Sequence, residues 1–477
     1  MEFKIGRIFL YYLTQLDERK FLLMLLGISL IIRLLYISFF PVIVEGDAQL
    51  WDRSAIGLIE GEGYISHGYS GEYGILRSYL PPGWPFFLAA IYSIFGYNPH
   101  IACIIQAVIG SFTCIIVYYI GKTVFNKKTA KLSAFIAALY PTFIIYSNML
   151  LTETLFIFLF SLSILYQLRV YDNPTSRNLL ISGILFGLAI LVRPVIIGII
   201  PLYPIWIILT SKDKKKDSIK FMSIFLIAIF ILSPWVIRNY YVHHEFVLVS
   251  TNGGVNFWAG NNPNATGRME SDSVLAIGII RNMTADEVQR DKLFYKMGFQ
   301  FIKDNPLKFL FLSIKKIAYF WGFILPFFSF YLFDLFINPI PEWLFIVLAP
   351  LTVIPYAIIL PLAMFNIIFY QRWEKKSYLL IFTIFYFSII HSIVLGGSRY
   401  HLPLMPFLIN FASYNIYSID KIKSEIILGD NMMRARGVFF ILCMLILIAI
   451  WYFSTIYGYS DEIQEIASTV IHSIAHG

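Results

Sequence analysis

Residues 100–131 read HIACIIQAVIGSFTCIIVYYIGKTVFNKKTAK, and this stretch decides the fold class. The part 100–121 contains no Asp, Glu, Lys or Arg, and about 20 such apolar residues span the hydrocarbon core of a bilayer as a helix. A basic cluster, Lys127, Lys128 and Lys131, follows it. Because basic residues concentrate in cytoplasmic loops, the stretch predicts a transmembrane helix that ends in the cytoplasm.

Similar apolar runs recur along the whole chain. Hydrophobic residues make up 58% of the 477 residues and charged residues only 14%, with a mean hydropathy of +0.71. Soluble domains carry about 25% charged residues, so the composition excludes a water-soluble protein. We predict an all-α polytopic membrane protein with about 11–13 spans. The clearest candidates are 21–43, 100–121, 132–150, 152–168, 179–193, 194–210, 221–241, 342–369, 378–395, 400–418 and 437–457.

The basic residues between these spans set the orientation. The net charge of +8 belongs to cytoplasmic loops in such a protein, so it does not indicate nucleic-acid binding. Placing every basic cluster and the N-terminus in the cytoplasm is self-consistent only if 83–97 does not cross. We expect 83–97 and 306–322 to form juxtamembrane helices in the interface. Two long outer loops result, 44–99 and 242–341, and the tail after residue 457 also lies outside.

Ionisable residues occur at the outer ends of several spans. Near membrane depth such residues cost several kcal/mol unless they are paired or solvated, so a group of them is a site hypothesis. The group comprises Asp47 after the first span, Glu153 between the third and fourth, Arg193 after the fifth, Arg238 ending the seventh, and Arg399 with His401 before the tenth.

Each of these residues also has a simpler interpretation. Asp47 could cap the helix that follows it, and Glu153 could stabilise a helix N-terminus through the helix dipole. Each arginine could extend to the lipid headgroups. Independent caps and headgroup contacts would scatter over both membrane faces, whereas these residues share one face. Their co-location therefore predicts a site at the outer face.

The residue types indicate the chemistry. A carboxylate can act as general base on an incoming hydroxyl, and arginine binds phosphate with two parallel hydrogen bonds. A phosphate leaving group at the outer face implies a lipid phosphate. A lipid-linked sugar transporter or flippase and a non-catalytic assembly subunit are the alternatives. Transporters place their sites near the bilayer midplane and often show repeated halves, and neither feature is present in this sequence.

The order of motifs resembles the GT-C glycosyltransferases of the family 39 type, which include aminoarabinose transferases and protein O-mannosyltransferases. The resemblance covers most of the chain up to about residue 420. It rests on Asp47 with Trp51, RSYLPPGWPFFLAAIYSIFG at 77–96, ALYPTFIIYSNMLLTETLFIFLF at 138–160, LAILVRP at 188–194, PWVIRNYYVHHEFVLVSTNGGVNFWAGNNPNATG at 234–267 and SRYHLPLMPF at 398–407.

This resemblance implies a GT-C fold and an inverting transfer of one sugar from a polyprenyl-phosphate donor to a lipid, glycan or protein acceptor. The transmembrane catalytic domain would comprise residues 1–420, and 421–477 would add a last span and a short outer tail. Asp47 would be the catalytic base and Glu153 would assist it. The donor phosphate would be bound by Arg77, Tyr79, Arg193, Arg238, Arg399 and His401.

The sequence departs from its relatives at two of these places. Aminoarabinose transferases carry an acidic residue and a lysine before the proline pair, whereas Arg77-Ser78-Tyr79-Leu80 precede Pro81 here. Protein mannosyltransferases carry an Asp-Glu pair where this chain has Asp47-Ala48. A divalent metal ion stays open as a cofactor, although no ligand spacing supports one. We expect a multi-pass protein of a bacterial or archaeal plasma membrane, with its active site facing outside; the sugar and the acceptor are not identified.

Overall fold

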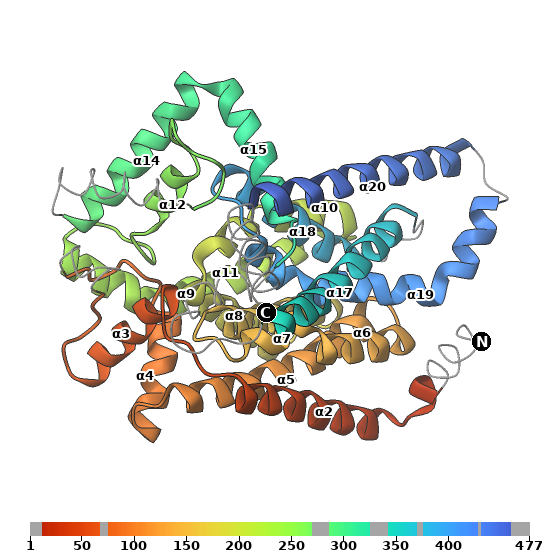
Figure 1. Cartoon of the computed structure of the whole chain (residues 1–477), viewed down its shortest axis with the longest axis horizontal. Coiled ribbons are helices and arrows are strands. Elements are labelled where there is room, and N and C mark those ends of the chain that lie inside the picture. The colour runs from red at the N-terminus through yellow and green to blue at the C-terminus, as the bar shows by residue number, and fades with distance from the viewer. Residues whose placement is uncertain are drawn as a thin grey trace, which may run out of the picture.

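The computed structural model describes residues 12–66, 75–269, 286–324, 342–369, 375–427 and 431–458. Within these ranges the regular elements are all helices, apart from an isolated bridge between Ser66 and Leu76. Figure 1 shows long helices packed into a bundle and shorter helices collected at one end of it. The predicted all-α architecture is confirmed.

Helices occupy all eleven predicted spans. They are α2 (Glu18–Phe39), α5 (Pro99–Val124), α6 (Lys127–Leu139), α7 (Pro141–Tyr146), α8 (Glu153–Asp172), α9 (Ser176–Val192), η1 (Pro194–Ile199), α10 (Leu202–Thr210), α11 (Lys214–His243), α17 (Glu342–Phe369), α18 (Ser377–Ile393), η2 (Ser398–Leu404), α19 (Met405–Ile427) and α20 (Asn431–Gly458). In the described part of the chain, six of them are long and apolar enough to cross a membrane, namely α2, α5, α8, α11, α17 and α20. The chain is a multi-pass membrane protein.

Three predicted spans are interrupted, and proline causes each interruption. The segment 132–150 divides into α6 and α7 because Pro141 lacks an N–H and keeps the preceding residue out of helical geometry. The segment 194–210 begins as a 3₁₀ helix and becomes α-helical only after Pro201. The segment 400–418 likewise begins in η2, which contains Pro403. The second and third interruptions lie directly at Arg193 and Arg399.

The cytoplasmic clusters predicted from the sequence meet at one end of the bundle. Glu18, at the start of α2, pairs with Lys122 at 2.7 Å and Lys127 at 3.1 Å. Lys376 pairs with Asp172 at 2.7 Å and donates to the Thr123 carbonyl at 3.3 Å. Basic segments that are distant in the sequence therefore share one end, as the orientation argument requires.

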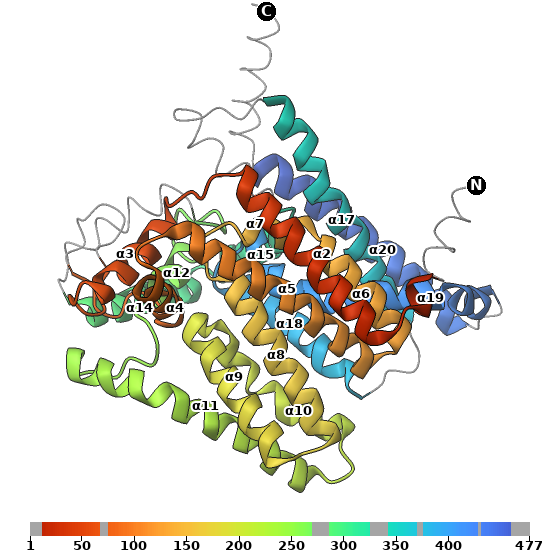
Figure 2. The same cartoon turned by 90° about the horizontal axis from the view of Figure 1, so that it is seen from below.

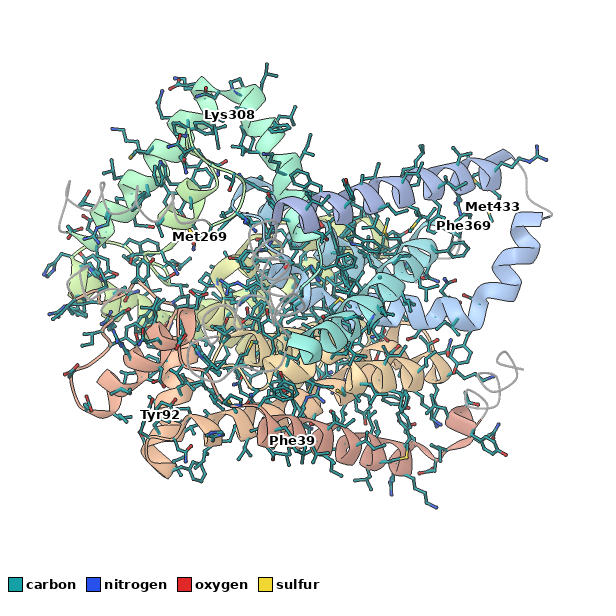
Figure 3. All side chains as sticks on the ribbon, viewed as in Figure 1. Phe39, Tyr92, Met269, Lys308, Phe369 and Met433 are labelled. Carbon is teal, nitrogen blue, oxygen red and sulfur yellow. The ribbon has the colours of Figure 1, made fainter. Side chains whose placement is uncertain are left out.

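The two loops predicted to lie outside form helices at the other end of the bundle, and two of these helices occupy the segments predicted to be juxtamembrane. Outer loop 1 forms α3 (Asp47–Ile59) and α4 (Gly83–Phe95), and outer loop 2 forms α12 (Gly253–Ala259), α14 (Glu287–Asp304) and α15 (Pro306–Phe320). Figures 1 and 2 both show α3, α4, α12 and α14 gathered at one end of the molecule, where α11 also ends. In Figure 3, Tyr92 marks α4 and Lys308 marks the turn between α14 and α15.

A buried carboxylate fixes α3 on α4. Asp52 accepts a hydrogen bond from the Tyr92 hydroxyl at 2.6 Å and another from the Tyr97 hydroxyl at 2.9 Å. Burial raises the pKa of Asp52, although both tyrosine hydrogen bonds oppose the shift. Because Asp47 is the first residue of the same helix, this contact also helps to set its position.

Candidate active site

Asp47 pairs with Arg399 at the end of the bundle where α3 begins. Gly46 is the N-cap of α3 and has φ 55°, a left-handed conformation that suits glycine, so Asp47 is the first residue of the helix rather than its N-cap. Its Oδ2 accepts a hydrogen bond from Arg399 Nη1 at 2.7 Å. The two side chains are 34% and 39% exposed, so the pair is accessible to a ligand.

The segment before Arg399 is held by the outer helices. The Ile393 carbonyl accepts hydrogen bonds from Lys316 Nζ and from Asn261 Nδ2, both at 2.9 Å. Lys316 is fully buried and also donates to Asn261 Oδ1 at 2.8 Å. The position of Arg399 therefore depends on α12 and α15 as well as on the bundle.

Glu153 and Arg193 form a second, deeper ion pair. Glu153 begins α8, and its Oε1 lies 2.5 Å from Arg193 Nη2. Arg193 ends α9 in an extended conformation, as expected before Pro194, and its Nε donates to Thr152 Oγ1 at 2.7 Å. The Glu153 side chain is only 1% exposed. The negative charge of Glu153 is stabilised both by the N-terminus of α8 and by the Arg193 guanidinium.

The two pairs belong to one charged group. Arg399 interacts electrostatically with Glu153 as well as with Asp47. Asn148, five residues before Glu153, donates to the carbonyls of Phe40 and Pro41 and so holds the segment that leads to Asp47. We call Asp47, Glu153, Arg193 and Arg399 the charge cluster; its formal charge is balanced, so its members compensate one another's burial.

Arg238 lies in a different group, where it holds outer loop 1. Its Nη1 donates to the Arg77 carbonyl at 2.7 Å and to Ser78 Oγ at 2.9 Å, and its Nη2 donates to the Tyr64 carbonyl at 3.2 Å. The guanidinium also stacks over Trp235, 4.8 Å from the ring centroid. These contacts engage the guanidinium with the protein's own main chain. The predicted role in phosphate binding stays a prediction.

Arg77 and Tyr79 belong to the same group as Arg238. The Arg77 side chain is exposed, and Tyr79 is half-buried against an apolar cluster formed by Val255, Trp258 and Phe294. The structure therefore brings four of the eight predicted site residues into the charge cluster and places three in this second group.

His401 is buried in the bundle. Its Nδ1 hydrogen-bonds the Phe320 carbonyl at 2.6 Å, and its ring stacks on Tyr356 and Trp321. The side chain is 0% exposed. A phosphate has no access to this ring without a rearrangement, so we assign His401 a packing role in this structure in place of the predicted one.

The charge cluster does not fit a metal ion. Among the described residues, no three His, Cys, Asp or Glu side chains are grouped so as to hold one. Asp47 and Glu153 each face an arginine, and a guanidinium repels a cation at the position where a second ligand would be needed. The arrangement suits a bound anion better than a cation.

Two residues that the sequence does not single out join these groups. Thr152 accepts a hydrogen bond from Arg193, and its position directly before Glu153 is a signal that could have identified it. Glu287 accepts hydrogen bonds from the main chain of Arg77 and Ser78. Glu287 lies in an amphipathic polar segment, where one sequence offers no means to distinguish it from its acidic neighbours.

Comparisons with known proteins agree with this architecture. Residues 80–237 match the family model described as dolichyl-phosphate-mannose-protein mannosyltransferase. A search of curated proteins finds no significant match. The archaeal oligosaccharyltransferase AglB from Archaeoglobus fulgidus, in complex with an inhibitory peptide and a dolichol-phosphate, has a TM-score of 0.52 at 15% identity. The match covers 91% of this chain and 54% of AglB.

Other solved structures extend this comparison. AglB tethered to an acceptor peptide with the NVT sequon also gives a TM-score of 0.52, at 15% identity, over 90% of this chain and 53% of that one. ArnT from Cupriavidus metallidurans bound to undecaprenyl phosphate has a TM-score of 0.43 at 12% identity. The match covers 87% of this chain and 82% of ArnT. The chain spans about half the length of AglB, and identity this low shows the fold alone. The chain has the GT-C fold, and residues 80–237 resemble the mannosyltransferase family.

Proposed function

We propose that the protein transfers a sugar from a polyprenyl-phosphate-linked donor to an acceptor hydroxyl or similar nucleophile at the non-cytoplasmic face, with inversion. The observation that carries the proposal is the accessible Asp47–Arg399 pair beside the buried Glu153–Arg193 pair. The dolichol-phosphate bound to AglB supports a lipid phosphate as the donor's leaving group.

Asp47 is suited to act as the base. Its carboxylate is accessible, so an acceptor hydroxyl can approach it and give up its proton as the oxygen attacks the anomeric carbon. The bond from that carbon to the phosphate oxygen breaks on the opposite face of the sugar, which inverts the configuration. Arg399 would bind the phosphate as it accumulates negative charge.

Arg399 has a second task in this scheme. It pairs with Asp47, and a bound phosphate would compete with Asp47 for the same guanidinium. Transfer of Arg399 to the phosphate would leave the Asp47 carboxylate free for the acceptor proton. Binding of the phosphate would thus be coupled to release of the base.

Glu153 has a different role from Asp47. Because it is buried and paired with Arg193, we propose that it fixes that guanidinium and does not touch the acceptor. Arg193 retains an exposed portion, at 18%, and would add a second positive charge beside the phosphate. Glu153 then acts through Arg193, as a positioning residue.

The alternative function is transport of the same lipid-linked sugar. The charge cluster is formed by the first residues of α3 and α8, the C-cap of α9 and η2, whereas transporters bind substrates near the bilayer midplane. This position supports transfer chemistry at the outer face of a bacterial or archaeal plasma membrane. The acceptor class, whether a lipid, a glycan or a protein, stays open.

The test is to find the donor in cells. Cells that lack the protein should accumulate one polyprenyl-phosphate-linked sugar, which mass spectrometry of extracted lipids identifies. The purified protein, given that lipid and an envelope extract, should release polyprenyl phosphate and yield a glycosylated product. Movement of the lipid across vesicles without its cleavage would contradict the proposal and favour the transporter.

A further inference from the structure

Glu287, at the start of α14, connects three segments that are far apart in the sequence. Its Oε2 accepts a hydrogen bond from the Arg77 main-chain N–H at 2.7 Å, and its Oε1 accepts one from the Ser78 N–H at 2.9 Å. The same Oε1 accepts from the Thr251 hydroxyl at 2.5 Å. One carboxylate of outer loop 2 thus binds two successive amides of outer loop 1.

The opposite side of the same short segment is held by α11. Arg238 binds the Arg77 carbonyl and Ser78 Oγ, and the Ser78 carbonyl accepts from the Thr251 N–H at 2.9 Å. Ser78 itself is fully buried. Charged groups from α11 and α14 therefore fix the main chain at Arg77 and Ser78, whereas the Arg77 side chain is exposed.

This segment leads directly to the charge cluster. The Tyr64 hydroxyl hydrogen-bonds the Leu80 carbonyl, and three residues later Gly83 starts α4. A Cβ on Gly83 would lie 2.8 Å from the main chain of Val192, the neighbour of Arg193. At most about 14 Å of extended chain separates Tyr79 from Gly83. We therefore expect a displacement of the main chain at Arg77 to move Gly83 and, with it, the residues next to Arg193.

We propose that Glu287 is a positioning residue for donor binding, which holds the 77–79 segment and, through the start of α4, the main chain beside Arg193. The inference rests on the proposed function, because that function places the donor phosphate beside Arg193. Glu287 does not touch the donor. Its two oxygens are both acceptors for main-chain amides, so an amide side chain can replace only one of them.

The experiment measures binding of undecaprenyl phosphate to the full-length protein in lipid nanodiscs by native mass spectrometry. Glu287→Ala should raise the dissociation constant roughly 10-fold to 100-fold, because a misplacement of about 1 Å has effects of that size. Glu287→Gln should fall between Glu287→Ala and wild type. Glu245→Gln is the matched control, since Glu245 is a half-buried carboxylate that pairs with Lys292, a residue of α14.

A second comparison separates positioning from a general loss of structure. If Glu287 acts through the position of Arg193, then Glu287→Ala should have little further effect in an Arg193→Gln background. Additive losses, or wild-type affinity in Glu287→Ala, would overturn the inference while the proposed function stands. If the wild-type protein does not bind undecaprenyl phosphate, the proposed donor class fails and the inference falls with it.

Discussion

Asp47 and Arg399 are 352 positions apart in the sequence and 2.7 Å apart in the structure. The sequence identifies both residues because a charge at the end of an apolar span is costly without a partner or water. It does not identify the partner, because a pairing over that separation depends on how the bundle folds. The same holds for Arg238, which donates to main-chain carbonyls. Every residue type has such a carbonyl, so the sequence does not indicate which residues accept.

Arg399 should matter for donor use more than for acceptor use. Arg399→Ala removes the proposed phosphate contact, so we expect the donor KM to rise about tenfold or more while the acceptor KM changes little. Arg399→Lys keeps the positive charge but cannot bind phosphate in a bidentate manner, so its donor KM should lie between those of Arg399→Ala and the wild type. Steady-state kinetics with each substrate varied in turn would reveal this, and equal losses for both substrates would instead indicate a structural role.

Glu153 should matter for stability as well as for activity. Glu153→Gln leaves Arg193 without its charged partner in a largely buried position, which we expect to cost roughly 3 kcal/mol. Combining Glu153→Gln with Arg193→Gln should cost less than the single variants predict, because no isolated charge remains. Thermal unfolding of the four proteins in one detergent measures the coupling. Strictly additive losses would show that the pair is not a unit.

At the scale of elements, hydropathy predicts the existence of the helices but not their interruptions. The eleven predicted spans all contain helices, because some 20 apolar residues allow little else in a bilayer. Pro141, Pro201 and Pro403 shorten three of them. Such breaks are tolerated because neighbouring helices can satisfy the main-chain groups that proline leaves free. Arg33 provides one such contact, donating to the Ala138 carbonyl near the α6–α7 break at 3.3 Å.

The contact between α12 and α14 should depend on pH through Asp291. Its Oδ1 accepts a hydrogen bond from the Gly254 N–H at 2.6 Å. Burial raises the pKa of Asp291 to about 6, reinforced by the nearby charge of Glu287 and opposed by the Gly254 hydrogen bond. A carboxyl with a raised folded-state pKa contributes stability at pH values below its ordinary pKa of 3.8, and this contribution is lost as the pH rises through about 6.

Asp291→Asn should therefore stabilise the protein at pH 7 to 8. The amide oxygen keeps the hydrogen bond from Gly254 and carries no charge to desolvate, so we expect a gain on the order of 1 kcal/mol that vanishes near pH 4. Thermal unfolding across this pH range, or hydrogen exchange of the α12 amides, measures the effect. A loss of stability at pH 7 would mean that the charged carboxylate is needed in the folded state.

At the scale of the whole molecule, the distribution of charge predicts which ends of the helices meet. Basic segments of four loops lie together at one end, and α3, α4, α12 and α14 lie at the other (Figure 2). How the outer loops fold over the charge cluster is not readable from the sequence. It depends on contacts such as the hydrogen bond from Lys316 to Asn261, two polar residues that belong to no recognisable sequence motif.

Labelling from outside the cell tests this orientation. Lys128→Cys and Gln300→Cys each place a thiol at an exposed position, one at either end of the bundle. In a background with Cys443→Ser, a membrane-impermeant maleimide should label the cysteine at position 300 in intact cells and the one at position 128 only after lysis. The reverse pattern would place the charge cluster in the cytoplasm and remove the case for an outer-face reaction.

The most direct measurement of the central claim is sugar transfer by Asp47→Asn with the donor identified in cells. Loss of a general base should lower turnover by about 100-fold or more, while the variant still inserts, folds and binds undecaprenyl phosphate. Glu60→Gln, at the exposed end of the same helix, is the control and should behave like wild type. Turnover of Asp47→Asn at the wild-type rate would contradict the assignment of Asp47 as the base on which this account depends.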